Sequence, residues 1–124
     1  CEDAGADGIS LINTMLGMRI DLRRRKPVIA NTMGGYSGPG IFPVAVRMVY
    51  QVAHAVKIPV IGMGGITTGE DAVEFFLAGA KAVAVGTAIF ADPMAPVKVI
   101  KGINDYLDRK GFKSVNDIIG LFGR

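Results

Sequence analysis

The chain has 124 residues, of which 50% are hydrophobic and 20% charged, which is enough for one compact domain with an apolar core. Its formal net charge is +3, and its single cysteine excludes an internal disulfide and a cysteine-based metal site. No apolar run reaches the roughly 18 residues of a membrane span, and no signal-like start is present. The sequence therefore predicts a protein of a reducing, cytoplasmic compartment, with no membrane partner.

The first residues predict a junction between a helix and a strand. Ala4-Gly-Ala-Asp-Gly-Ile9 resembles Ala78-Gly-Ala-Lys-Ala-Val83, where a helical pattern runs into a buried strand pattern. Because the chain starts within such a junction, at Cys1 rather than at a methionine, we expect it to be the C-terminal part of a longer protein.

A short strand and a long insertion are predicted next. Gly8–Asn13 is an apolar run that ends in polar residues, as expected for a barrel strand. Met15–Gly35 is too long for an ordinary connection, and Arg19–Leu22 and Pro27–Ala30 predict a β-hairpin within it. We interpret the basic run Arg23–Lys26 as its solvated turn and not as a nucleic-acid site, because no aromatic residue interleaves with it.

A helix is predicted to begin at Pro43, since proline favours the first helical turn. Its apolar stripe is formed by Val44, Met48, Val49, Val52, Ala53 and Val56. His54 lies beside this stripe, and a single histidine brings no metal site. We interpret it as a structural helix residue.

The second half of the chain predicts a strand at Pro59–Met63 and a helix that ends near Gly79. Thr67 with Glu70, or Thr68 with Asp71, would form a capping box there, which explains these carboxylates better than an acid–base pair does. From Asp92-Pro93 a further helix is predicted to place Val97, Ile100, Ile103 and Leu107 on one face and to end at Lys110-Gly111. Ser114 and Asp117 would cap a last short helix.

Two strand ends carry glycines where a helical pattern begins, at Pro59–Gly65 and at Ala82–Thr87. Glycine lets backbone N–H groups approach an anion closely, so Gly64, Gly65, Gly86 and Thr87 predict a phosphate site. In (β/α)8 barrels such a site follows the last two strands. The predicted fold is thus α/β, the C-terminal part of a (β/α)8 TIM barrel with a β-hairpin insertion, in a single domain portion spanning residues 1–124.

Neutral polar residues stand at the end of the earlier strand. Asn13 and Thr14 offer donors and acceptors that suit a polar planar ligand. The glycine-rich segment Gly34–Gly40 is a plain loop or a further ligand loop, and the residues alone favour neither. No Ser/His/Asp or Cys/His combination is visible, so hydrolytic catalysis has no support.

Four ordered motifs resemble the catalytic subunit of dihydroorotate dehydrogenases, most closely the NAD-linked class. They are Ile9–Thr14, Gly34–Ile41 with Pro43 and Arg47–Tyr50, Ile58–Ile66, and Val85–Ala88. The resemblance implies an FMN-containing (β/α)8 barrel that oxidises dihydroorotate to orotate in pyrimidine (UMP) biosynthesis. It also implies an electron-transfer subunit with FAD and an iron–sulfur cluster that passes electrons to NAD, and a homo-oligomer of the catalytic subunit.

The resemblance implies roles for individual residues. Asn13 and Thr14 would bind the substrate, and Ile12 would contribute a backbone contact to FMN. The FMN phosphate would lie among Gly64, Gly65, Gly86 and Thr87, with Gly38 also against the cofactor. The family's catalytic base is a cysteine on an earlier loop, to which Cys1 does not correspond, so no catalytic residue is expected in this chain.

Two alternatives remain open from the sequence. One is a flavin domain like that of dihydropyrimidine dehydrogenase, which shares the glycine motifs and a pyrimidine substrate. The other is a non-catalytic half-barrel that binds phosphate and associates through open sheet edges.

Overall fold

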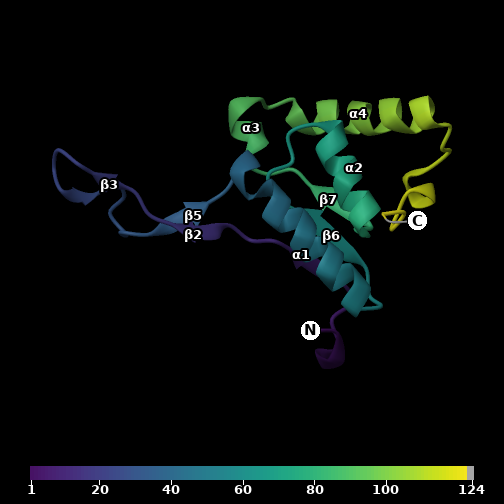
Figure 1. Cartoon of the computed structure of the whole chain (residues 1–124), viewed down its shortest axis with the longest axis horizontal. Helices are drawn as coiled ribbons and strands as arrows, with labels where there is room; N and C mark the ends of the chain where they lie inside the picture. The colour runs from purple at the N-terminus through teal and green to yellow at the C-terminus, as the bar shows by residue number, and fades with distance from the viewer. Residues whose placement is uncertain (123–124) are drawn as a thin grey trace.

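Three short parallel strands organise the fold, in the order β1 (Ile9–Leu11), β6 (Val60–Met63) and β7 (Ala82–Ala84). The computed structural model describes residues 1–122 (Figure 1). The register pairs Ile9 with Val60 and Met63 with Ala84, so all three strands run in one direction and end at one edge of the sheet. Each is shorter than its predicted range: β1 and β7 end before the polar and glycine residues that follow them, and β6 begins one residue after Pro59.

Helices cover one face of this sheet. Because successive strand residues point to opposite faces, Val60 and Gly62 point toward the helices and Ile61 points away. Val60 is 2% exposed, whereas Ile61 is 39% exposed and has Ser10 and Ala82 beside it in the register. The helix side forms the core, and the other side remains open to solvent in the described chain.

The helix α1 (Phe42–Ala55) follows the 3-10 turn η2 (Pro39–Ile41) and begins as predicted, with Pro43 in its first turn. Val49 is fully buried, and the other members of the predicted stripe pack against the core. Ala45 is also fully buried, a position that the stripe did not include. Its small side chain lets α1 lie close to the end of β6.

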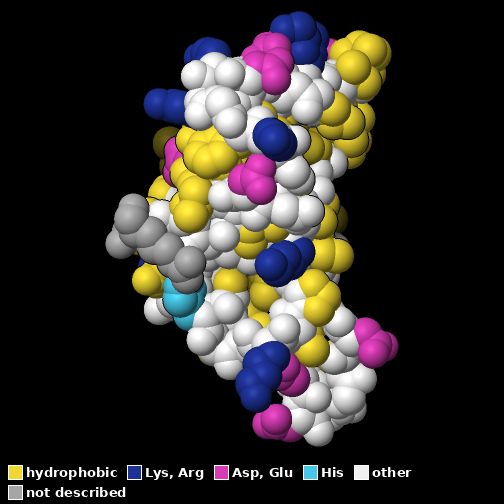
Figure 2. Space-filling model, turned by 90° about the vertical axis from the view of Figure 1, so that its right-hand side faces the viewer, with side chains coloured by type: hydrophobic (Ala, Val, Ile, Leu, Met, Phe, Trp, Pro, Cys, Tyr) yellow, Lys and Arg dark blue, Asp and Glu magenta, His cyan; other side chains and the backbone are white. Residues whose placement is uncertain are grey.

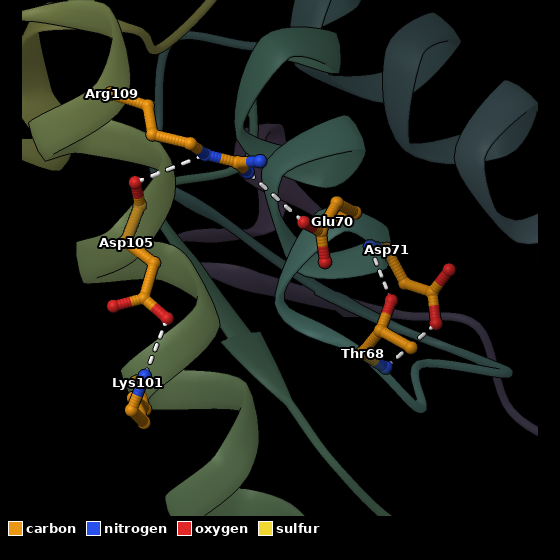
Figure 3. A network of polar contacts seen from close by, with 6 residues as sticks. All are labelled: Thr68, Glu70, Asp71, Lys101, Asp105 and Arg109. Carbon is orange, nitrogen blue, oxygen red and sulfur yellow. Dashed lines mark hydrogen bonds and ion pairs between the residues drawn. The ribbon is translucent and has the colours of Figure 1, made fainter.

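The helix α2 (Gly69–Ala78) packs beside α1 and is capped by Thr68 and Asp71 (Figure 3). The Asp71 backbone N–H donates to Thr68 Oγ1 at 3.1 Å, and Asp71 Oδ2 accepts from the Thr68 N–H at 2.8 Å. Of the two predicted capping pairs, this one forms. The alternative pairing of Thr67 with Glu70 does not form: the Thr67 hydroxyl donates to Asp71 Oδ2 at 2.8 Å, and Glu70 Oε1 accepts from Arg109 at 3.1 Å.

The longest helix, α4 (Ala95–Lys110), crosses α2 and ends at Gly111 as predicted. Its predicted apolar face was half wrong, since Val97 and Ile100 are 55% and 59% exposed. The buried residues follow a strict spacing of four: Ala95, Val99, Ile103 and Leu107. Contact with α2 selects this stripe, because Gly102 lies against Gly69 with no room for a side chain between the two backbones.

Between β1 and α1 the chain forms an extended arm, which projects from the body of the molecule (Figure 1). Its inner ribbon pairs β2 (Met15–Gly17) with β5 (Gly34–Tyr36), and its outer ribbon pairs β3 (Ile20–Asp21) with β4 (Lys26–Pro27). The predicted hairpin is confirmed, but its strands are shorter and the second begins at Lys26, which was assigned to the turn. Asp21 closes the basic turn, since its Oδ1 accepts from the N–H groups of Arg23 and Arg24 at 2.9 and 3.1 Å.

The face that looks away from the arm carries a mixed surface. Figure 2 shows lysine or arginine side chains interspersed there with aspartate or glutamate, and apolar side chains between them. The arm differs from this face, because four consecutive basic residues follow Leu22 there.

A short helix that the sequence did not predict, α3 (Ala88–Ala91), follows β7, and α4 begins at Ala95 and not at Asp92-Pro93. The two ends of the chain behave as the sequence predicts. The opening 3-10 turn η1 (Glu2–Ala4) ends at Gly5, and Ser114 with Asp117 caps the 3-10 turn η3 (Val115–Asp117). His54 is exposed, and its Nδ1 lies 2.8 Å from the Tyr50 carbonyl oxygen. None of the helices within residues 1–122 is long and apolar enough to cross a membrane.

The Asp71 cap yields a stability prediction. Partial burial raises the pKa of Asp71, but hydrogen bonds from Thr67 and Thr68 outweigh it and hold the pKa below its ordinary value. Replacement Asp71→Asn should cost about 1 kcal/mol of unfolding free energy at pH 7. Since a lowered pKa means that the ionised form stabilises the fold, the cost should shrink as the pH falls below about 4.

Urea unfolding of the protein at pH 7 and pH 3 measures this effect. The matched control is Glu70→Gln, whose ion pair with Arg109 joins two side chains that are each 63% exposed, and which should cost under about 0.5 kcal/mol. An equal cost in both variants, or a cost for Asp71→Asn that does not change with pH, would contradict the capping role.

Candidate functional site

The carboxyl ends of the three strands meet around a cavity of about 510 Å³. Each strand contributes the residues that directly follow it: Ile12, Asn13 and Thr14 after β1, Gly64 and Gly65 after β6, and Val85, Gly86 and Thr87 after β7. Parallel α/β sheets place ligands at this edge, because the loops there are free to vary while the strands hold their ends in register. The geometry therefore brings the predicted residues together.

A second, smaller hollow of about 170 Å³ adjoins the first. Both are lined by Gly65, Gly86 and Thr87, so the two hollows lie side by side at the glycine turns. Gly38 lines only the smaller hollow, and Asn13 and Thr14 line only the larger one. The larger hollow could hold a ring system, and the smaller one could hold a single small group beside it.

Backbone amides dominate the electrostatics of the junction. Within residues 1–122, the N–H groups of Gly65, Gly86 and Thr87 donate no hydrogen bond to another protein atom. In the same part of the chain, no lysine, arginine or other ionisable side chain lines either hollow. An anion here would be held by neutral donors, and these residues supply no group that could take a proton from a ligand.

The glycines at the two strand ends are required for different reasons. Gly64 has φ +131°, and a Cβ on it would lie 2.7 Å from the Ala45 Cβ. Gly65 has φ +77°, and a Cβ there would lie 2.8 Å from the Gly38 carbonyl oxygen. A Cβ on Gly86 would meet no protein atom within 4 Å. Packing within the chain explains the first two glycines and does not explain the third.

Asn13 and Thr14 face the larger cavity from the end of β1 and the root of the arm. Asn13 Oδ1 accepts from the Thr14 backbone N–H at 2.7 Å, which fixes the orientation of the side-chain amide. The Asn13 amide nitrogen makes no hydrogen bond within the described residues and remains available to a ligand. Gly35 packs against the Thr14 side chain and holds it at the rim.

A pair of hydroxyl groups joins the segment after β5, where the arm returns to the body of the molecule, to the end of β7. Thr87 Oγ1 donates to Ser37 Oγ at 2.8 Å. Ser37, Ser10 and Met63 also line the larger cavity, and the sequence did not single out these three. Ser37 lies in the glycine-rich segment Gly34–Gly40, so this segment is more than a plain loop: it forms β5 and also lines the cavity. The position of the segment directly before a helix was the sequence signal that could have identified Ser37.

Comparison with known proteins gives a consistent picture. The sequence model of the family described as Dihydroorotate dehydrogenase matches residues 1–107. The protein named "Dihydroorotate dehydrogenase B (NAD(+)), catalytic subunit" of Alkaliphilus metalliredigens is 65% identical over 116 residues, which cover 94% of this chain and 38% of that protein. The protein of the same name from Parabacteroides distasonis is 60% identical over 119 residues, 96% of this chain and 39% of its own length.

A solved structure of DHODH from Eimeria tenella, in complex with ferulenol, superposes with a TM-score of 0.80 at 28% identity. It covers 99% of this chain, and this chain covers 33% of it. The resemblance drawn from the motifs and the predicted fold, part of an α/β barrel with a hairpin insertion, are both confirmed. The chain spans less than two fifths of the length of the curated relatives described above.

The contrast between Gly64 and Gly86 yields a prediction. Gly64→Ala should cost about 2–4 kcal/mol of unfolding free energy, because it forces a side chain into a positive φ and against Ala45. Gly86→Ala should cost under about 0.5 kcal/mol, because it adds a methyl group in open space. Urea unfolding of the two variants in ligand-free protein measures both, and similar midpoints would refute the distinction.

Proposed function

The chain belongs to the dihydroorotate dehydrogenase family, and we propose on that premise that the protein containing it oxidises dihydroorotate to orotate with FMN, in pyrimidine biosynthesis. The observation that carries the proposal is the pair of adjoining hollows, which share three backbone amides without a protein hydrogen-bond partner and have no charged side chain in their lining within residues 1–122. A ring system with a phosphate ester on a short linker has the same two-part shape.

FMN fits these residues on chemical grounds. Its phosphate would lie in the smaller hollow, where Gly65, Gly86 and Thr87 present N–H groups and Thr87 adds a hydroxyl, with Gly38 on the opposite wall. Gly64 would hold the turn that positions Gly65, and Ile12 would offer backbone contact beside the ring. When bound, FMN supplies an acceptor for the two electrons of the oxidation.

The substrate would be recognised by neutral side chains. Orotate and dihydroorotate carry ring amide groups, and Asn13 matches them with one donor group and one acceptor. Thr14 and Ser10 would add hydroxyl groups on the same wall of the cavity. Because no ionisable side chain lines the site in residues 1–122, the proton acceptor of the reaction would come from a segment outside the described residues.

Partners are part of the proposal. The relatives are named as the catalytic subunit of an NAD(+)-linked enzyme, a name that implies a second subunit. We assign that subunit the transfer of electrons from FMN to NAD through FAD and an iron–sulfur cluster. We also assign self-association to the catalytic subunit.

Gly86→Val tests the phosphate site. Gly86 lines both hollows, and a Cβ on it meets no protein atom within 4 Å. The added bulk would therefore compete with the ligand and not with the protein, so FMN retained after gel filtration should fall at least about tenfold, while the unfolding midpoint of ligand-free protein stays near wild type. Gly86→Ala, which adds less bulk at the same position, should give an intermediate loss. Full FMN occupancy in the valine variant would remove the β7 end from the cofactor site.

Asn13→Ala tests the substrate role. Loss of hydrogen bonds to the substrate ring should lower kcat/KM for dihydroorotate by roughly 5- to 150-fold, the equivalent of about 1–3 kcal/mol, with FMN content unchanged. Asn104→Ala, on the exposed side of α4, is the control and should retain wild-type kinetics. Steady-state kinetics that find the two variants equal would show that Asn13 does not contact the substrate.

A further inference from the structure

The hydroxyl groups of Ser37 and Thr87 form a hydrogen bond of 2.8 Å although 50 residues of chain separate them. Ser37 lines the larger hollow, and Thr87 lines both hollows. Thr87 has a place in the proposed phosphate site, whereas Ser37 has none. A contact between a residue of the site and a second polar side chain at its wall raises the question of what the second side chain does.

The backbone on both sides of Ser37 is held by contacts other than this hydrogen bond. Tyr36, the residue before it, pairs with Met15 in the inner ribbon of the arm. The carbonyl oxygen of Gly38, the residue after it, accepts from the Ile41 N–H at 3.1 Å. Ser37 therefore presents its hydroxyl from a fixed backbone position.

The first turn of α3 orients the backbone of Thr87. The carbonyl oxygen of Gly86 accepts from the Ile89 N–H at 3.0 Å, and that of Thr87 accepts from the Phe90 N–H at 3.2 Å. The N–H and C=O groups of one planar peptide unit point in opposite directions, so the Thr87 N–H points away from this turn. The amide that would meet an anion is thus oriented by the helix, and the side chain is left to be oriented by another group.

The Thr87 hydroxyl does not cap the helix that it precedes. A threonine directly before a helix commonly accepts a hydrogen bond from the N–H of the second or third helical residue. Thr87 makes no such bond to α3. Its Oγ1 donates to Ser37 Oγ instead, so Ser37 determines where the Thr87 hydroxyl lies.

The pair can reverse its hydrogen bond without losing one. Each hydroxyl has one proton and two lone pairs, so Ser37 can donate to Thr87 as readily as it accepts. In residues 1–122, the Ser37 hydroxyl donates to no protein atom, so its proton is available. A hydrogen bond to an ionised acceptor is about twice as strong as one between neutral groups, so an anion near Thr87 favours the reversed order. Thr87 then donates to the anion while it accepts from Ser37.

We propose that Ser37 is a positioning residue for the phosphate of the bound flavin and acts through Thr87. It holds Thr87 Oγ1 in place before the ligand arrives, and it donates to that oxygen once Thr87 donates to the phosphate. A hydroxyl that accepts one hydrogen bond donates a stronger one, because the two bonds polarise each other. The inference rests on the proposed function, since it assigns the phosphate to the end of β7.

Flavin affinity tests the role of Ser37. In the protein that contains this chain, freed of flavin, Kd is measured for FMN and for riboflavin, which lacks the phosphate, by quenching of flavin fluorescence. Ser37→Ala should weaken FMN binding roughly 5- to 10-fold and leave riboflavin binding within about twofold. Ser37→Thr, which keeps the hydroxyl, should restore FMN binding to within about threefold of wild type. The control Tyr50→Phe removes a hydroxyl outside both hollows and should bind FMN as wild type does.

A double-mutant cycle tests whether Ser37 acts through Thr87. Thr87→Val should weaken FMN binding at least about tenfold, because it removes a donor to a charged group. If Ser37 acts through that donor, Ser37→Ala should weaken FMN binding by less than about twofold further in the Thr87→Val background. Independent effects that multiply would show that Ser37 does not act through Thr87.

Ligand-free stability separates positioning from a merely structural role. Thr87 is exposed and Ser37 half-buried, so the urea midpoint of Ser37→Ala without flavin should stay near wild type. A lowered midpoint together with equal losses for FMN and riboflavin overturns the proposal in favour of a structural contact. An unchanged FMN Kd in Ser37→Ala, while wild type prefers FMN over riboflavin, overturns the role of Ser37 alone. A wild type with no preference for FMN contradicts the phosphate site of the proposed function itself, and this inference with it.

Discussion

The close contact at Gly64 and Gly65 is the constraint on which the rest of the structure depends. The missing side chain of Gly64 lets Ala45 of α1, Ile12 after β1 and Ile41 of η2 approach one point at the end of β6. Gly65 lies in the same way against Gly38 at the end of the arm. These two residues thereby fix the end of one strand, the start of a helix and the root of the arm relative to each other, and the walls of both hollows follow from that arrangement.

The same constraint explains why the proposed site needs so little charge. When a turn is held open by packing, its N–H groups are oriented before any ligand arrives, so binding does not have to order them. Neutral donors in a fixed array hold a phosphate in many α/β proteins, and the hydroxyl pair of Ser37 and Thr87 adds a polar edge at 2.8 Å. Both ends of the arm contribute to the larger cavity, through Thr14 and Ser37.

Most of the local structure could be predicted from the sequence, because its signals are local. Pro43, the Thr68–Asp71 pair and Gly111 mark helix ends through their own backbone chemistry, and all three lie where the sequence places them. The buried stripe of α4 could not be predicted, since Val97 and Ile103 are both apolar and only the contact between Gly69 and Gly102 selects one face. For the same reason the sequence could not separate Gly64, which packing requires, from Gly86, which it does not, and could not bring Ser37 to Thr87 across 50 residues of chain. The assignment of ligand to these residues remains a prediction.

The central claim is that the glycine turns after β6 and β7 bind a phosphate through their backbone amides. Amide chemical shifts of Gly65, Gly86 and Thr87, followed in isotope-labelled protein during titration with FMN and then with riboflavin, test it most directly. Riboflavin shares the ring system but lacks the phosphate, so the account predicts large downfield shifts of these three amides with FMN and small ones with riboflavin. Equal shifts with both ligands, or none with FMN, would contradict it.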